Sequence, residues 1–275
     1  MCEALVTSVE LDGDKATGVN FVHGGSNHTV KIDREVIVSC GALQSPQILE
    51  LSGIGDPDVL KAAGVECKIV NKAVGENFQD HVFTAVGWEL NEGTPTLEMI
   101  YDPDVMAAAQ EQLVEEAAGP LTHISSTQGF FPYKLFATEE EQAEIIKSIE
   151  DSMTGASEYR KKQYETIIAH LKDDKSANLQ LVLIAAQAGW DNAVHDQSQV
   201  FPPPKEGQLP GITAALCLQY PASRGSVHIK SADPSEHPAI NPGYLSHPAD
   251  AAVLAAGVKV STADIPVIQM RLIEC

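Results

Sequence analysis

Basic residues are scarce in this 275-residue sequence. Lys and Arg together number 18, against 38 Asp and Glu, so the formal net charge is −20. A field of this sign repels nucleic-acid phosphates and anionic membrane surfaces. The composition therefore argues against nucleic acid or a membrane as a partner.

Cysteines and long apolar runs are also few. The five cysteines are odd in number, lie far apart and form no C-x-x-C pair. This spacing predicts neither a zinc site nor a dense disulfide framework. No stretch approaches the about 18 apolar residues of a membrane-spanning helix, and Met1 is not followed by the basic and apolar regions of a signal peptide.

Several catalytic signatures are missing from the sequence. There is no H-E-x-x-H zinc helix, no G-x-S-x-G nucleophile elbow and no G-x-x-x-x-G-K phosphate loop. None of the 20 glycines forms the dinucleotide fingerprint G-x-G-x-x-G. His228 on a predicted strand, and His237 and His247 before prolines, are typical of surface histidines. We therefore assign no catalytic residue within this chain.

One stretch, residues 41–55, organises the rest of the chain. The β-branched residues 36–38 before it predict a strand buried on both faces. Ser45 is placed to cap a short helix with Pro46 at its first position, and Gly53 ends that helix. A helix N-terminus aimed back at a strand end suits an anionic group.

The other segments alternate between strand and helix patterns. Asp12-Gly13 and residues 24–27 supply tight turns between the first strands, and Thr138 begins a capping box. The sequence predicts helices over 57–63, 103–118, 156–172 and 249–262, and a further acidic amphipathic helix that follows the Thr138 capping box. It predicts strands over 4–11, 16–22, 28–39, 65–70, 82–90, 179–186, 212–220 and 225–231.

Three blocks of residues resemble the glucose-methanol-choline family of FAD-dependent oxidoreductases. Residues 41–55 are similar to that family's second signature: a Gly-Ala pair, Ser-Pro, two aliphatic residues and Ser-Gly-Ile-Gly. Residues 74–81 resemble the segment that leads out of the family's flavin domain. Residues 223–227, with 231–234 and 241–245, resemble the start of its C-terminal region. The blocks follow the family's order along the chain.

The resemblance implies an α/β (α+β) fold in which both ends of the family's chain are missing. Residues 1–80 would be the C-terminal part of an FAD-binding Rossmann-like domain without its N-terminal fingerprint. Residues 81–248 would be a substrate-binding domain with a mostly antiparallel sheet covered by helices. Residues 249–275 would be a helix and a truncated tail.

The resemblance also implies FAD as cofactor and a small-molecule alcohol as substrate. The residues expected near the cofactor are Val6, Cys40, Gly41, Ala42 and Asn77. Val6 has a second interpretation, as an ordinary core residue of its strand. The family's catalytic histidine lies in segments C-terminal to the 241–245 block, and this sequence contains no match to them.

Two functional hypotheses follow. The chain is a portion of an FAD-dependent alcohol oxidase or dehydrogenase and is inactive by itself, or it is a non-catalytic binding or regulatory remnant of such an enzyme. An in-frame G-x-G-x-x-G upstream and a histidine segment downstream in the neighbouring coding sequence would favour the first. The family framework suits aryl alcohols, sugars, choline and cyclising polyketide intermediates alike, so substrate, compartment and oligomeric state stay open.

Overall fold

The computed structural model describes residues 1–122, 126–193, 195–263 and 271–272. The chain divides into two compact units. The first contains Met1–Asp80 and Ser223–Ser246, and the second contains His81–Ala222 and the described residues from 247 onward. The sequence had placed residues 223–246 with the second domain, whereas they pack in the first unit because their strands pair there with residues 76–78.

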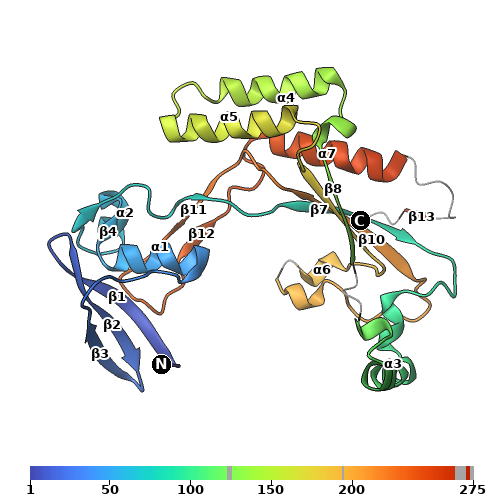
Figure 1. The fold of residues 1–275 in the computed structure, drawn as a ribbon, viewed down its shortest axis with the longest axis horizontal. Coiled ribbons are helices and arrows are strands. Elements are labelled where there is room, and N and C mark those ends of the chain that lie inside the picture. The colour runs from blue at the N-terminus through green and yellow to red at the C-terminus, as the bar shows by residue number, and fades with distance from the viewer. Residues whose placement is uncertain (123–125, 194, 264–270, 273–275) are drawn as a thin grey trace. The chain divides into compact units, whose positions relative to one another are not determined.

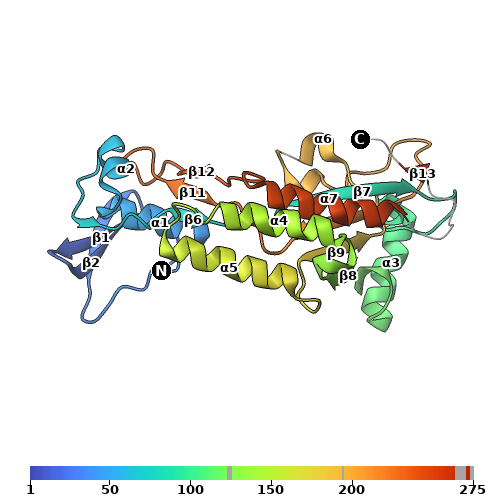
Figure 2. The same cartoon turned by 90° about the horizontal axis from the view of Figure 1, so that it is seen from above.

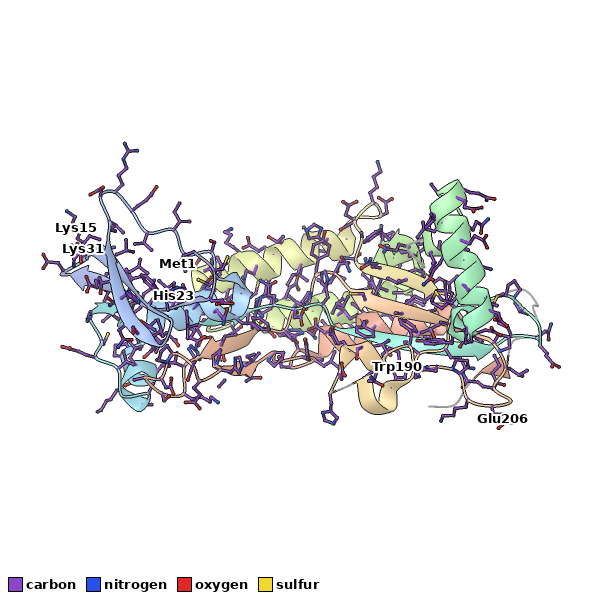
Figure 3. All side chains as sticks on the ribbon, turned by 90° about the horizontal axis from the view of Figure 1, so that it is seen from below. Met1, Lys15, His23, Lys31, Trp190 and Glu206 are labelled. Atoms are coloured by element: carbon purple, nitrogen blue, oxygen red, sulfur yellow. The ribbon has the colours of Figure 1, made fainter. Side chains whose placement is uncertain are left out.

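An antiparallel ribbon of three strands opens the first unit (Figure 1). It consists of β1 (Ala4–Asp12), β2 (Lys15–His23) and β3 (Ser26–Lys31). Figure 3 shows Lys15 and Lys31 near one end of the ribbon, and Met1 and His23 near the other. The three predicted strands are confirmed, but the third ends at Lys31, well before residue 39.

The expected buried strand over residues 36–38 is wrong. Residues 32–40 form no strand, and Ile37 is 78% exposed. β-branched residues favour a strand only where a neighbouring strand pairs with them. This segment is unpaired within the described part of the chain.

The helix of the 41–55 stretch begins earlier than expected. α1 spans Gly41–Leu51, so Pro46 lies inside the helix and Ser45 is not its N-cap. The expected end is confirmed, because Ser52 is the C-cap and Gly53 follows with a φ of +89°. The Ser52 hydroxyl also accepts a hydrogen bond from the Val9 amide at 2.8 Å, which ties α1 to the ribbon.

A short parallel pair follows α1. Its strands, β4 (Ile54–Gly55) and β5 (Ile69–Val70), flank α2 (Pro57–Ala62). Asp56 caps α2 by accepting a hydrogen bond from the Asp58 amide at 2.9 Å, as the Asp-Pro-Asp pattern predicts. The strand expected over 65–70 is reduced to its last two residues.

A second small sheet joins distant parts of the first unit. Its strand order is β12 (Ala239–Asn241), β11 (Gly225–His228) and β6 (Glu76–Phe78), and both pairings are antiparallel. The sheet therefore joins residues 76–78 to residues 225–241, and β11 packs against α1.

The second unit is built on an antiparallel sheet of five strands. Its order is β13 (Arg271–Leu272), β7 (Phe83–Glu89), β10 (Gly211–Leu218), β9 (Leu179–Ile184) and β8 (Ser126–Phe131). Every pairing in it is antiparallel. The mixed α/β character with antiparallel sheets agrees with the predicted fold class.

Helices cover this sheet. α7 (Pro248–Ala263) packs on β7, β9 and β10, and α4 (Glu139–Asp151) packs on both α7 and α5 (Glu158–Lys172). Figure 2 shows the three helices side by side. Their core includes the fully buried Ile149, Leu179 and Tyr133, and burial raises the pKa of Tyr133 to about 12.

The second unit contains further, mostly short, helices. They are η1 (Leu97–Tyr101), α3 (Pro103–Glu116), η2 (Pro120–Thr122), η3 (Tyr133–Leu135), α6 (Trp190–Ala193) and η4 (Gln197–Gln199). Asp102 caps α3 as the Asp-Pro pattern predicts. Within the described residues, no helix combines the length and the apolar character that crossing a membrane requires.

Candidate functional site

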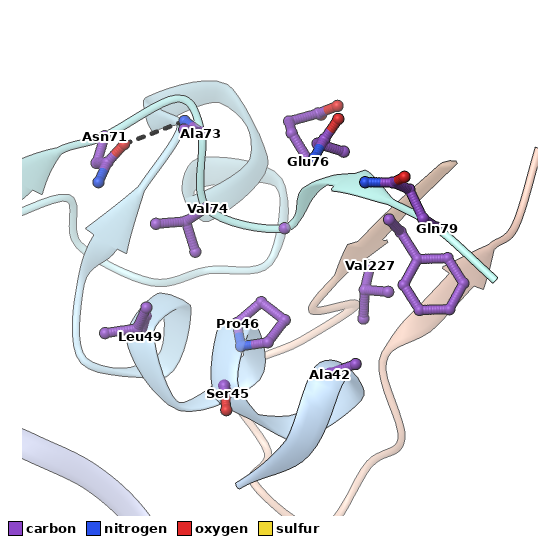
Figure 4. Close-up of a pocket in the computed structure, with 13 residues that line it drawn as sticks. Ala42, Ser45, Pro46, Leu49, Asn71, Ala73, Val74, Glu76, Gln79 and Val227 are labelled. Carbon is purple, nitrogen blue, oxygen red and sulfur yellow. Dashed lines mark hydrogen bonds between the residues drawn. The ribbon is translucent and has the colours of Figure 1, made fainter. Parts of the chain in front are cut away.

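A hollow of about 510 Å³ lies in the first unit, against α1 (Figure 4). Four segments form its walls: α1, the loop before β6, β6 with the residue after it, and β11. The lining residues are Ala42, Ser45, Pro46, Leu49, Asn71, Ala73, Val74, Gly75, Glu76, Asn77, Phe78, Gln79 and Val227. Its volume falls within the usual range of ligand pockets, about 300 to 1,000 Å³.

The start of α1 supplies one wall of the hollow. Cys40 precedes the helix and its side chain makes no capping hydrogen bond. The Ser45 hydroxyl instead accepts a hydrogen bond from the Cys40 amide at 3.1 Å. Pro46 has no N–H, so it withdraws the helical donor from the Ala42 carbonyl on the same wall. Independently of Pro46, the first amides of a helix have no acceptor within the helix, so the first turn of α1 has donor capacity toward an anionic group.

The loop before β6 is fixed by two local features. The Asn71 carboxamide oxygen accepts a hydrogen bond from the Ala73 amide at 3.1 Å, drawn as a dashed line in Figure 4. Gly75 has a φ of +78°, and a Cβ there would lie 2.3 Å from the Val227 carbonyl oxygen. Only glycine lets this loop approach β11 so closely.

Asn77 lies in the hollow with an unusual backbone. Its φ is +62°, in the left-handed region that Asn tolerates better than most residues. Its side-chain oxygen accepts a hydrogen bond from the Arg224 Nε at 3.1 Å. This bond links the Asn77 side chain to the residue that precedes β11.

An acid–histidine–acid cluster runs from the buried Glu50 through His228 to Glu76, an exposed residue that lines the hollow. Glu50 is fully buried; its Oε1 lies 2.7 Å from the His228 Nδ1, and its Oε2 accepts from the Ile229 amide at 2.8 Å. The His228 Nε2 lies 3.1 Å from the Glu76 Oε1. Burial alone would lower the pKa of His228, but the hydrogen bonds to both carboxylates outweigh it and raise that pKa above 6.5.

Asp80 has a structural partner in the first unit. Tyr244 donates a hydrogen bond from its hydroxyl to the Asp80 carboxylate, and this bond, ahead of burial, raises the pKa of Tyr244 to about 12. The contact joins the 74–81 segment to the 241–245 block.

The five residues expected near the cofactor differ in their position relative to the hollow. Ala42 and Asn77 line the hollow. Gly41, with a φ of +84°, and Cys40 adjoin it at the start of α1. Val6 lies on β1, paired with β2, and does not line the hollow.

Sequence reasoning missed several lining residues and the acid–histidine–acid cluster. Val74, Glu76 and Phe78 flank the expected Asn77, so the similarity of the 74–81 segment was the signal that could have found them. Glu50 was detectable as an acid between two aliphatic residues of an apolar helix. Within the described residues, no group of three or more His, Cys, Asp or Glu side chains could hold a metal ion.

Solved structures share this architecture. An FAD-dependent oxidoreductase from Chaetomium thermophilum superimposes with a TM-score of 0.76 at 19% identity, covering 94% of this chain and 43% of that one. A fungal aryl-alcohol oxidase superimposes with a TM-score of 0.75 at 21% identity, covering 99% of this chain and 46% of that one. The chain has the fold of a segment of these oxidoreductases.

Sequence comparison gives the family. Models of the GMC oxidoreductase family match residues 1–83 and 221–265. Dehydrogenase mpl7 of Monascus purpureus is 35% identical over 266 residues, covering 94% of this chain and 43% of that protein. An oxygen-dependent choline dehydrogenase of Staphylococcus haemolyticus is 48% identical over 89 residues, covering 32% of this chain and 16% of that protein. The chain belongs to the GMC oxidoreductase family, and it spans less than half the length of these relatives.

Proposed function

We propose that this chain contributes part of the flavin site of an FAD-dependent oxidoreductase that acts on the CH–OH group of a small-molecule alcohol. Family membership supports this proposal, and so does the hollow at α1, whose wall carries two of the residues expected near the cofactor. Bound FAD would supply the hydride acceptor. The chain's own residues contribute binding and orientation.

The observation that carries the proposal is the fit of this hollow to one part of FAD. The uncapped first turn of α1 presents backbone donors and the positive end of the helix dipole, which suit a pyrophosphate. Ala42, Ala73 and Gly75 have small side chains or none, so the backbone of these walls can approach a ligand closely. We therefore assign the ADP half of FAD to the hollow.

The proposal gives the remaining residues supporting roles. Arg224 orients Asn77 at the hollow, and His228 turns the Glu76 carboxylate toward its own ring. That pairing reduces the repulsion between Glu76 and a bound phosphate. The 275 residues contain no G-x-G-x-x-G and no assigned base, so we expect the chain alone to hold FAD weakly and not to turn over alcohol.

A competition titration tests the assignment. FAD is added to the purified chain, and its binding is followed by equilibrium dialysis with ADP or riboflavin as competitor. If the hollow takes the ADP half, ADP competes and riboflavin does not. Competition by riboflavin alone would contradict the assignment, and absence of saturable FAD binding would contradict the flavin site itself.

The alternative function is a non-catalytic binding or regulatory protein that retains this framework. The missing fingerprint and the missing base within the 275 residues favour it. The coding sequence on either side of these 275 residues distinguishes the enzyme from the non-catalytic remnant. An in-frame fingerprint upstream and a histidine segment downstream would support the enzyme, and stop codons in both positions would support the remnant.

A further inference from the structure

A second cavity, of about 270 Å³, lies wholly within the second unit. Four short segments meet around it: η1, the residues at the start of η2, the end of β9 with the residues after it, and the loop at Phe201. It is lined by Leu97, Glu98, Ile100, Tyr101, Pro120, Leu121, Ile184, Ala186, Gln187, Phe201 and Pro202. No residue of this cavity belongs to the hollow at α1.

The one carboxylate among the described lining residues already accepts three hydrogen bonds. Glu98 accepts hydrogen bonds from the Gln187 amide at 2.9 Å, the Gly211 amide at 3.1 Å and the Thr96 hydroxyl at 2.8 Å. Two of the donors are backbone amides and one is a hydroxyl, and charge-assisted hydrogen bonds of this kind stabilise the Glu98 carboxylate. Glu98 thus closes the cavity wall and leaves little capacity to attract a cation.

The other polar side chains on the wall are engaged as well. The Tyr101 hydroxyl donates to the Phe201 carbonyl oxygen at 2.6 Å, and the Gln187 side-chain oxygen accepts from Gln208 at 2.8 Å. The first of these bonds ties η1 to the Phe201 loop across the cavity. Its walls are therefore set by contacts between segments that lie far apart in the sequence.

What the cavity offers a ligand is apolar surface. The described lining residues include no Lys, Arg or His, so an anion finds no counter-charge there. An apolar cavity of about 150 Å³ already admits benzene, so 270 Å³ admits a substituted single ring. We propose that this cavity binds a neutral molecule with one aromatic ring, such as a simple aromatic alcohol.

The proposal connects this cavity to the chemistry of the family. If the chain serves an alcohol oxidoreductase, the ligand class points to aromatic alcohols rather than sugars or choline, and this step alone rests on the proposed function. The binding itself needs neither FAD nor turnover. Binding here and flavin binding at α1 can therefore fail independently.

The probe is benzyl alcohol, titrated against the purified chain without FAD and followed by saturation-transfer NMR. We expect saturable binding with a dissociation constant on the order of 1 mM, as suits so small a ligand. Choline tests whether a cation is accepted through Glu98, and sorbitol tests a polyhydroxylated ligand. Neither should bind at the same concentrations.

Two pairs of variants locate the binding. Ile100→Trp fills the cavity and should weaken benzyl alcohol binding by about tenfold or more. Met99→Trp, on the same helix, 46% exposed and off the lining, is its matched control. Phe201→Ala removes part of the apolar wall of the cavity and should weaken binding several-fold. Phe130, which lies on β8, is 54% exposed and does not line the cavity, so Phe130→Ala should not weaken binding. Far-UV circular dichroism checks that each variant is folded.

The outcomes separate the possibilities. Benzyl alcohol binding that is lost in Ile100→Trp or Phe201→Ala but retained in both controls supports the site. No saturable binding to the unaltered chain overturns it. Equal binding in cavity and control variants overturns it as well, and choline binding at comparable affinity overturns the neutral-ligand assignment. FAD retention measured on the same samples reports on the proposed function separately.

Discussion

Glu50 links two parts of the first unit that are distant in the sequence. It lies on α1, is fully buried, and meets His228 on β11, 178 residues away. A buried carboxylate is costly unless it is hydrogen-bonded and paired. The His228 ring and the Ile229 amide meet that requirement. The pair therefore holds the wall of the hollow against the small sheet.

The raised pKa of His228 makes the stability of the first unit depend on pH. The folded state binds the His228 proton more tightly than the unfolded state does, so this stabilisation is fully present below pH 6.5. It is lost as pH rises from there through the raised pKa. We expect the unfolding free energy to fall over that interval in urea titrations.

A matched pair of variants isolates this contribution. His228→Asn should remove most of the pH dependence above pH 6.5, because the titrating ring is gone. His237→Asn, at an exposed position of the same unit, should leave the slope of the unfolding free energy against pH unchanged. A slope unchanged by His228→Asn would contradict the assignment.

Gly75 tests how closely the loop before β6 must approach β11. Gly75→Ala should destabilise the first unit by about 2 kcal/mol or more, because strain at positive φ adds to a clash with the Val227 carbonyl. Gly64→Ala is the control, since Gly64 has nearly the same φ, +76°, and open space around it. Urea unfolding of both gives the cost of the clash by difference. Equal losses would show that the close approach is not needed.

At the scale of elements, the capping box at the start of α4 shows how a local sequence pattern positions a helix that contributes to the core. The Thr138 hydroxyl accepts from the Glu141 amide at 3.1 Å, and the Glu141 carboxylate accepts from the Thr138 amide at 2.9 Å. α4 contributes the buried Ile145 and Ile149 to the core of the second unit. The local pattern thus sets where a core-forming helix begins.

Removing this cap should weaken the second unit measurably. Thr138→Ala should cost about 1 kcal/mol in unfolding free energy, the usual value of an N-cap. Thr166→Ala, at an exposed position within α5, should cost clearly less. Urea denaturation followed by circular dichroism checks both, and equal costs would show that the box contributes little.

Elements with local signals could be predicted from the sequence. Asp56-Pro57, Asp102-Pro103 and Thr138 begin helices where expected, because a cap depends on residues within one turn. β7 and β10 also lie where their apolar patterns predict.

Features that depend on distant partners could not be predicted. Residues 36–38 have strand-forming side chains but no paired strand in the described chain, and α1 begins at Gly41 although Pro46 suggested a later start. The Glu50–His228 contact and the placement of residues 223–246 in the first unit arise from pairing across the chain. Similarity of short motifs led us to expect Val6, Ala42 and Asn77 near the cofactor; of these, Ala42 and Asn77 line the hollow and Val6 does not.

At the scale of the whole molecule, the chain combines two compact units with separate candidate ligand sites. We propose the ADP half of FAD for the hollow at α1 and a neutral aromatic ring for the cavity at η1. The chain spans 43% of Dehydrogenase mpl7. Ligand binding at each of the two sites can be measured on this chain without any assay of turnover.

The affinity of the chain for FAD tests the central claim most directly. We expect saturable binding with a dissociation constant above about 1 μM, too weak to survive gel filtration. Ala42→Leu, which places a larger side chain in the hollow, should raise that constant by about tenfold or more. Ala62→Leu, at a similarly exposed alanine of α2, should leave it unchanged. Equal affinities for the two variants, or no saturable binding, would contradict the flavin site at α1.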